Sequence, residues 1–227
     1  MFGFNYLTDD KNTTTNYVID PVKGIVIAFN ESWQYLFSKP FASVNNMINV
    51  NKTLYITGKS NVFKTDYYLN TSFTYNGNDY GGIYHNSSNS TLYIVSCAQQ
   101  TIFTFSLALS VVDSISTAPH YPYGIQVNNS KIYVSTTDGL VVVIENRVIL
   151  QTFQACNNIS SPIYSILIDP FGYIATACSS CNATYLYHIN GTFTGLSMKA
   201  SGSPHFISFD SKREFVVLTP DQINIYV

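Results

Sequence analysis

The chain has few charged residues and no long apolar segment. Charged side chains make up 11% of its 227 residues and the net charge is −2, whereas charged residues are roughly 25% of typical soluble proteins. Such a composition provides no basic surface for nucleic acid or for an anionic membrane. Apolar runs such as 140–144 have the length of a strand, well below the ~18 residues of a membrane span. The sequence therefore predicts neither a nucleic-acid partner nor a membrane partner.

A leader sequence and catalytic motifs are also missing. Residues 1–6 contain no basic region followed by an apolar stretch, so no secretory signal is visible and the chain is either intracellular or a mature or truncated piece. Glutamate occurs only at Glu31, Glu145 and Glu214. No nucleophile elbow, phosphate loop or zinc-protease motif is present. We therefore expect no catalytic constellation and no cofactor.

What the chain does contain is a repeated position. A short apolar run ends at an Asp or Asn six times, with spacings of 31, 35, 42, 41 and 41 residues. A repeat near 40 residues, built from short apolar strands and turn residues, is typical of a β-propeller. The sequence thus predicts an all-β, six-bladed propeller with four-stranded blades, formed as a single domain by residues 1–227. The repeated positions are Asp20, Asn51, Asn86, Asn128, Asp169 and Asp210.

The strand order within a repeat predicts one extra strand at the start of the chain and one missing strand in the last repeat. Each repeated position closes a first strand, and two apolar runs and a more polar fourth run follow it. The last repeat ends on its third strand at Val227, while the run 2–7 precedes the first repeat. A ring of blades is stabilised when its open edges are paired. We therefore expect the N-terminal strand to complete the C-terminal blade as its outer strand.

The fourth repeat resembles a known family. Pro122–Asn128 followed by Lys131–Ser135 resembles the Pro-x-Gly-Val-x-Val-Asp and Leu-Tyr-Val-Ala-Asp pattern of NHL-repeat propellers. The resemblance extends loosely over the whole chain in six units. It departs from the family after the second strand, where an Asp-x-x-Asn-x-Arg turn is replaced by residues 136–139. The resemblance thus implies the propeller fold but no particular ligand.

Asparagine-linked glycosylation sites are about twice as frequent as composition alone predicts. All ten fall in predicted turns or loops, where a glycan can be carried without disturbing a core. Turns between first and second or third and fourth strands place six of them on one face: Asn51, Asn70, Asn86, Asn89, Asn128 and Asn190. The other four are predicted on the opposite face: Asn12, Asn30, Asn158 and Asn182. We expect several sites to be glycosylated, which favours a secreted protein.

The four cysteines are expected on the less glycosylated face. Cys97, Cys178 and Cys181 lie at turns between second and third strands, and Cys156 lies in a link between blades. A Cys156–Cys178 disulfide is favoured and Cys156–Cys181 is the next choice, since sequence does not fix connectivity. Zinc binding by the Cys178-x-x-Cys181 pair is the competing interpretation. The absence of a second such pair makes it the weaker one.

Histidines and tyrosines form the remaining candidate site. His120 and His205 lie in links between blades and, with Tyr121, Tyr123 and Tyr164, are candidates for an aromatic patch near the channel mouth that contacts a sugar or a peptide. His85 and His188 are interpreted as strand residues. Residues that enter the first strands include no carboxylate, which argues against the oxygen-ligated calcium site of six-bladed hydrolases.

Three functions remain open at this point. The favoured one is a non-catalytic, extracellular, N-glycosylated interaction or structural scaffold that contacts a protein or glycan through its loop face. The second is a protomer of a glycan-coated fibre, assembled by exchange of the N-terminal strand between copies. The third is a metal-dependent enzyme of the lactonase or lyase type.

Overall fold

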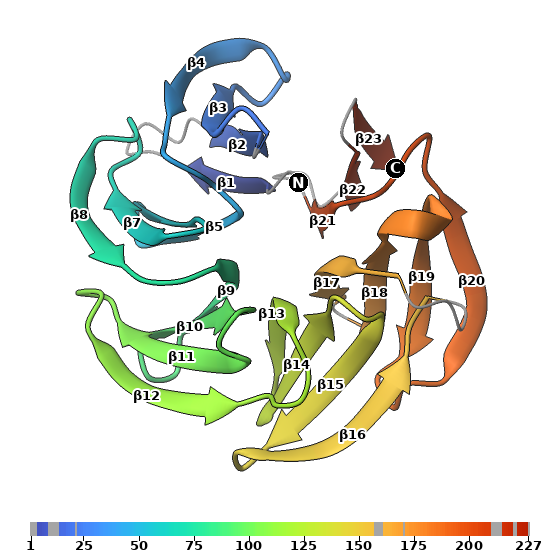
Figure 1. The fold of residues 1–227 in the computed structure, drawn as a ribbon. Helices are drawn as coiled ribbons and strands as arrows, with labels where there is room; N and C mark the ends of the chain where they lie inside the picture. The colour runs from blue at the N-terminus through green and yellow to red at the C-terminus, as the bar shows by residue number, and fades with distance from the viewer. Residues whose placement is uncertain are drawn as a thin grey trace.

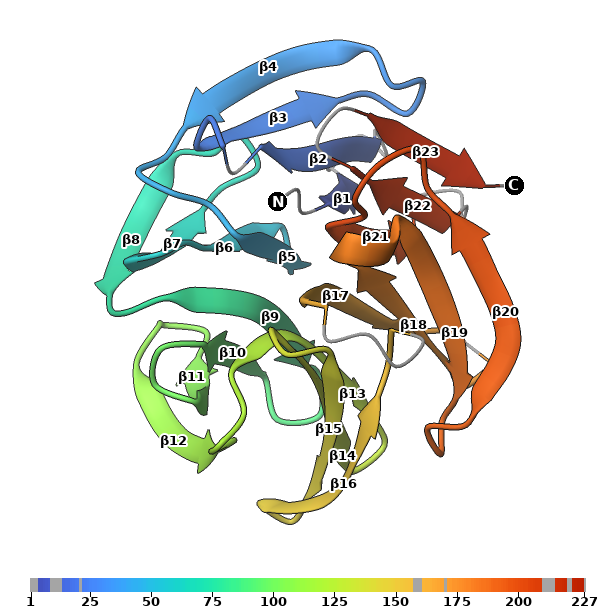
Figure 2. The same ribbon diagram turned by 45° about the vertical axis from the view of Figure 1, so that its right-hand side comes forward.

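Six antiparallel sheets are arranged radially around a central axis (Figure 1). The computed structural model describes residues 4–8, 14–20, 22–156, 161–169, 171–209, 215–219 and 222–226. This confirms the predicted all-β, six-bladed propeller. In both ribbon views the outer strands β4, β8, β12, β16 and β20 run along the rim of the disc (Figures 1 and 2).

The sheets are called blades 1 to 6 in chain order. Blade 1 comprises β1 (Phe4–Thr8), β2 (Thr14–Asp20), β3 (Ile25–Phe29) and β4 (Tyr35–Pro40). Blades 2 and 3 comprise β5 (Asn46–Val50), β6 (Thr53–Thr57), β7 (Asn61–Thr65), β8 (Thr71–Asn76), then β9 (Tyr80–Asn86), β10 (Thr91–Ser96), β11 (Thr101–Ser106) and β12 (Val111–Ser116). Blades 4 and 5 comprise β13 (Pro122–Asn128), β14 (Lys131–Thr136), β15 (Leu140–Glu145), β16 (Val148–Gln154), then β17 (Ile163–Ile168), β18 (Tyr173–Cys178), the 3₁₀ turn η1 (Ser179–Cys181), β19 (Ala183–His188) and β20 (Phe193–Lys199). Blade 6 has β21 (Phe206–Phe209), β22 (Phe215–Leu218) and β23 (Ile223–Tyr226).

The predicted closure by the N-terminal strand is wrong. β1 pairs with β2 from Phe4 opposite Val18 to Thr8 opposite Thr14, and so it is the innermost strand of blade 1. Blade 6 has three strands in the described part of the chain. Because β1 and β2 are neighbours in sequence, their antiparallel pairing closes only a short connection, which costs little entropy. Exchange of the N-terminal strand into another copy's last blade therefore loses its structural basis.

The same correction shifts the strand assignment of blade 1. Asp20 ends the second strand, whereas Asn51 and Asn86 lie at the ends of innermost strands. The run predicted as the second strand of blade 1, residues 24–29, contains its third strand. In the other blades the predicted first, second and third runs coincide with the observed order of strands.

The hydrophobic core is divided among the interfaces between adjacent blades. For example, Tyr17 and Ile19 of blade 1 are fully buried in one cluster with Leu54 and Ile56 of blade 2. Each of the other neighbouring pairs also shares a cluster. Blades 1 and 6 meet in the cluster of Val18, Phe206, Val216 and Leu218. Side-chain packing, without a shared sheet, therefore closes the ring among the described residues.

Close approach of the innermost strands requires glycine at one point. A Cβ atom on Gly81 or Gly82 of β9 would lie 2.6 or 2.8 Å from the carbonyl oxygen of Tyr123, in the neighbouring β13. Contacts this short are too close for a methyl group, so glycine allows the two strands to approach. This tight packing narrows the centre of the ring.

The two sides of the disc differ in the connections they carry. The link side carries the turns between second and third strands and the links between blades. These two kinds of connection contact each other, since the Lys59 N–H donates to Ser43 Oγ (2.8 Å) and the Thr137 N–H donates to the Tyr121 carbonyl (3.1 Å). The opposite side carries the turns between first and second and between third and fourth strands.

Candidate functional site

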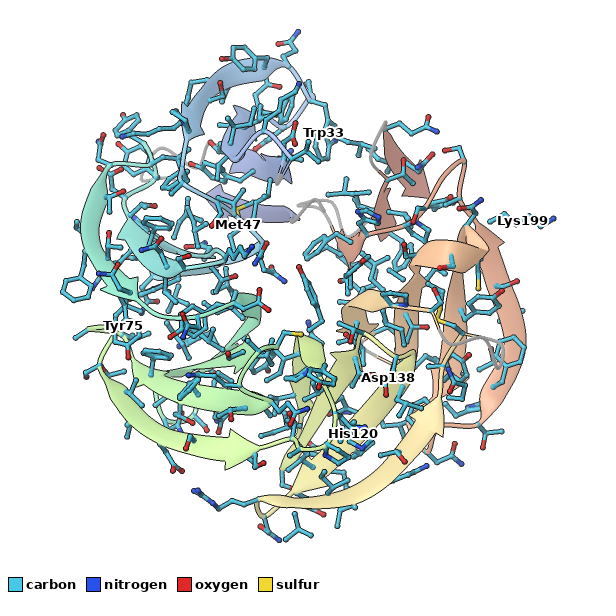
Figure 3. All side chains as sticks on the ribbon, in the orientation of Figure 1. Trp33, Met47, Tyr75, His120, Asp138 and Lys199 are labelled. Carbon is cyan, nitrogen blue, oxygen red and sulfur yellow. A yellow bond between two sulfur atoms is a disulfide. The ribbon has the colours of Figure 1, made fainter. Side chains whose placement is uncertain are left out.

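A cavity of about 200 Å³ lies at the centre of the ring. Its described lining comes from the innermost strands of blades 2 to 6 and contains amide, hydroxyl and apolar side chains, among them Asn46, Gln126, Ser165, Ser208 and Met47. Figure 3 labels Met47 on the inner part of blade 2. No carboxylate and no histidine is among the described lining residues. The described part of the cavity wall is thus uncharged and can offer hydrogen bonds to a small neutral group.

Three residues of the predicted patch form a row on the link side. The ring centroids of Tyr123 and Tyr164 are 5.1 Å apart, and those of Tyr164 and His205 are 5.0 Å apart. Both pairs meet edge to face, the favourable geometry for aromatic rings. The row crosses blades 4, 5 and 6, because each residue stands at the same place in its repeat, where the chain enters the innermost strand. We call these three residues the aromatic row.

His120 and Tyr121 lie earlier in the link that precedes β13. The His120 N–H donates to the Thr117 carbonyl (2.9 Å), and Tyr121 is 48% exposed. The structure thus brings together three of the five residues of the predicted patch and places the other two beside them on the same side.

Burial favours the uncharged forms of His205 and Tyr123 in the aromatic row. Removal of His205 from water lowers its pKa to about 4, so the ring is neutral at neutral pH. Its buried Nδ1 atom has no hydrogen-bond partner in the described part of the chain. Burial also raises the pKa of Tyr123, and the negative charge of Asp79 adds to this effect. The row therefore presents neutral ring edges and faces, which suit a peptide side chain or the apolar face of a sugar.

The other two histidines lie in strands. His85 belongs to β9, and burial lowers its pKa. His188 ends β19 and is exposed, with its ring 5.3 Å from that of Tyr173. Neither is part of the aromatic row.

The cysteines join a link to a turn. The Sγ atoms of Cys156 and Cys178 are 2.00 Å apart, which is a disulfide between the link preceding blade 5 and the end of β18. This is the pair that the sequence analysis favours. Cys97 and Cys181 are free thiols, both partly exposed. The disulfide occupies Cys178, so the pair with Cys181 is not available to zinc. No group of three or more metal-binding side chains occurs in the described residues.

The asparagines of the glycosylation motifs gather on one side more strongly than the sequence predicts. Asn12 and Asn158 lie outside the described residues. Asn30 moves to the opposite side, because the shift in blade 1 places it in the turn between third and fourth strands. Asn182 is the one described site on the link side. The sites on the opposite side are Asn30, Asn51, Asn70, Asn86, Asn89, Asn128 and Asn190.

None of the described site asparagines is buried. At two sites the hydroxyl group of the motif contacts its own asparagine. Ser88 Oγ donates to Asn86 Oδ1 (2.7 Å), and Thr91 Oγ1 donates to Asn89 Oδ1 (2.6 Å). These local turns hold the side-chain amides at the surface.

Comparison with known proteins identifies the fold but no family. No family model matches the chain, and no curated protein matches it. Solved structures do match. A catalytically inactive variant of virginiamycin B lyase from Staphylococcus aureus, with quinupristin, has a TM-score of 0.72 at 11% identity, covering 99% of this chain and 83% of the lyase.

Propellers of a different kind are equally similar. The WD40 propeller domain of Doa1 has a TM-score of 0.74 at 12% identity, covering 98% of this chain and 77% of that one. The Pan2 WD40 domain of Neurospora crassa has a TM-score of 0.68 at 8% identity, and the match covers 98% of this chain and 87% of the Pan2 chain. At such low identity these similarities establish the propeller fold alone. In the described residues, no helix is long and apolar enough to cross a membrane.

Proposed function

We propose that this chain is a non-catalytic, extracellular interaction scaffold that is N-glycosylated on its opposite side and contacts a protein or glycan partner through its link side. One observation carries the proposal: seven of the eight described glycosylation sites lie on the opposite side. Glycans there would leave the aromatic row and the links accessible. The disulfide supports an oxidising compartment. A chain in the crystal structure of the mitotic checkpoint complex has a similar fold, and its presence in a complex is compatible with an interaction role for this fold.

The lyase alternative has weaker support. A structural neighbour is a lyase, but the described lining of the central cavity offers uncharged groups. General acid–base catalysis needs a group whose pKa lies near the working pH. The pKa of His205, at about 4, lies far below neutral pH. A metal-dependent reaction predicts stoichiometric metal in the purified protein, which elemental analysis measures directly.

A pair of single substitutions tests the contact side. Gln99→Asn creates a glycosylation motif with Thr101 in the exposed turn between β10 and β11, on the link side. Val148→Thr creates one with Asn146 in the turn between β15 and β16, on the opposite side. Val148 is 59% exposed, so the change should not disturb the core. Each variant gains one additional glycan of the same size, so the two differ only in the side of the disc that carries it.

The readout is retention of partners by the purified, glycosylated protein. We expect the Gln99→Asn variant to lose partners that the unmodified protein retains after cross-linking, and the Val148→Thr variant to keep them. Digestion with a glycosidase followed by mass measurement checks that each new site is occupied. Equal retention by both variants would contradict a contact on the link side. A protein without any glycan would contradict the extracellular assignment.

A further inference from the structure

Three of the four cysteines lie together on the link side. Cys156 and Cys178 form the disulfide between the link that precedes blade 5 and the end of β18. Cys181 is a free thiol at the end of the turn η1, three residues after Cys178. Its Sγ atom lies 3.9 Å from the carbonyl oxygen of Cys156. The free thiol is therefore beside the cysteine to which Cys178 is bonded.

The disulfide and the free thiol differ in their access to solvent. Cys156 and Cys178 are each 0% exposed and belong to the hydrophobic cluster between blades 4 and 5. Cys181 packs against the same cluster but is partly exposed. The rate of thiol–disulfide exchange depends on access to the attacked sulfur, so a dissolved thiol reaches the buried bridge only through local opening. Cys181 is the member of the three that solvent reaches directly.

The turn η1 places Cys178 and Cys181 within reach of the same partner. η1 is a single 3₁₀ turn that begins directly after Cys178, and residues three apart are neighbours in such a turn. A disulfide needs Cα atoms within about 7 Å of each other. The Cα atoms of Cys156 and Cys178 are 5.7 Å apart, and the Cys181 sulfur already contacts the Cys156 backbone. A bridge from Cys156 to Cys181 therefore needs only a local adjustment of η1.

Tyr185 gives the free thiol a polar neighbour. It lies in β19 and packs, like Cys181, against the cluster that contains the disulfide. Burial raises the pKa of Tyr185, and Cys181 adds to this effect through its charge and a side-chain hydrogen bond. The tyrosine hydroxyl is therefore protonated at neutral pH and able to donate to the sulfur. Contacts with this hydroxyl and with the Cys156 carbonyl hold the Cys181 sulfur beside the bridge.

Hydrogen bonds connect η1 to the links on both sides of blade 5. The Ser180 N–H donates to Ser161 Oγ (2.9 Å), in the link that precedes the blade. Ser203 Oγ, in the link that follows the blade, donates to the Ser179 carbonyl (2.7 Å). A change of bridge at η1 would thus alter the positions of two links on the link side.

We propose that Cys156, Cys178 and Cys181 form a thiol–disulfide exchange site, at which Cys181 connects the buried disulfide to a low-molecular-weight thiol in the solvent. A small thiol is the expected substrate because Cys181 is only partly exposed. The site goes beyond the proposed function, and its test uses the purified chain without a partner. The two can therefore fail independently.

The reaction has two steps, each of which replaces one disulfide by another. In the first, the Cys181 thiolate attacks Cys156 Sγ, a Cys156–Cys181 bond forms, and Cys178 leaves as a thiolate that takes up a proton. In the second, the external thiolate attacks Cys181 Sγ and forms a mixed disulfide, and Cys156 leaves as a thiolate that is protonated in turn. The sum is one external thiol consumed and two protein thiols released, with no oxidant or reductant besides that thiol.

The rate at which reduced glutathione opens the disulfide tests the role of Cys181. The folded chain is incubated with excess glutathione at mildly alkaline pH, samples are quenched with acid, and free thiols are alkylated and counted by mass. We expect Cys181→Ser to slow the opening by about tenfold or more, because a thiol held beside its target acts at a far higher effective concentration than a dissolved one. The matched control is Cys97→Ser, which removes the other partly exposed thiol and should leave the rate unchanged.

Peptide mapping under non-reducing conditions identifies the intermediates. Early in the reaction we expect glutathione on Cys181 and alkylated thiols at Cys156 and Cys178. A second variant tests reach without any kinetics: Cys178→Ser, folded with oxidised glutathione, should form a Cys156–Cys181 bridge. Circular dichroism and thermal unfolding verify that each variant folds, and the mapping of the unmodified chain serves as the test if one does not.

Equal opening rates for the unmodified chain and Cys181→Ser would overturn the proposal, because the bridge would then open without the third cysteine. Glutathione found first on Cys156 or Cys178 would also contradict it, since the external thiol would then attack the bridge directly. A folded Cys178→Ser variant in which Cys156 and Cys181 stay unlinked would show that the two sulfurs are out of reach of each other.

Discussion

The carboxylates of Asp20 and Asp169 hold their own turns together. Asp20 Oδ1 accepts hydrogen bonds from the N–H groups of Val22 and Lys23 (both 3.1 Å), and Asp169 Oδ1 accepts them from Phe171 and Tyr173. At both positions the carboxylate therefore accepts hydrogen bonds from the turn that follows it. Asp and Asn serve there because they bond their own backbone two residues on and tolerate left-handed backbone.

His205 makes the stability of the fold sensitive to acid. Its pKa is about 4 in the folded chain and about 6.5 in an unfolded one. Between these values the unfolded state binds a proton that the folded state does not, so the free energy of unfolding falls as the pH drops from about 6.5 to about 4. We expect His205→Gln to reduce this dependence, measured by urea unfolding across that pH range.

The matched control for this measurement is His188→Gln, which removes an exposed histidine outside the aromatic row. His85 is also buried enough for its pKa to be lowered, so some acid sensitivity should persist in the His205 variant. Identical pH profiles for the unmodified protein and His205→Gln would show that His205 is not protected from protonation by the fold.

At the scale of elements, most strands can be predicted from the sequence because each blade repeats one local pattern. The spacing of 31 residues between Asp20 and Asn51 is the shortest of the five, against 35 to 42 in later repeats, and was the signal that blade 1 begins one strand earlier. The aromatic row was also predictable, since its members occupy equivalent positions where the chain enters the innermost strands. The packing of Trp33 against blade 6 was not, because it depends on which blade lies beside it.

The apolar residue in the turn before a fourth strand should contribute to the free energy of unfolding in proportion to its burial against the neighbouring blade. Leu69 is fully buried against blade 1. We expect Leu69→Ala to lower the free energy of unfolding by about 2–5 kcal/mol, through lost burial and a residual cavity. Chemical denaturation measures the change. The matched control is Leu196→Ala in β20, where the leucine is 61% exposed and the cost should be within about 0.5 kcal/mol. Equal costs at both positions would show that this turn is not part of the interface.

At the scale of the whole molecule, the ring has one interface unlike the others. Blades 1 and 6 meet through the cluster of Val18, Phe206, Val216 and Leu218, and no strand of one blade pairs with the other in the described residues. Among the described residues, this interface therefore depends on side-chain packing.

Local opening should consequently begin between blades 1 and 6. Segments with few buried contacts open at lower free energy than the global unfolding transition, and native-state hydrogen exchange detects this difference. We expect amides of β22, in blade 6, to exchange faster than those of β14, in blade 4, although both are second strands. Val216→Ala, which removes part of the cluster between blades 1 and 6, should widen the difference by accelerating β22 and leaving β14 nearly unchanged. Equal protection of β22 and β14 would show that this interface is as stable as the others, and that side-chain packing is sufficient to close a six-bladed ring.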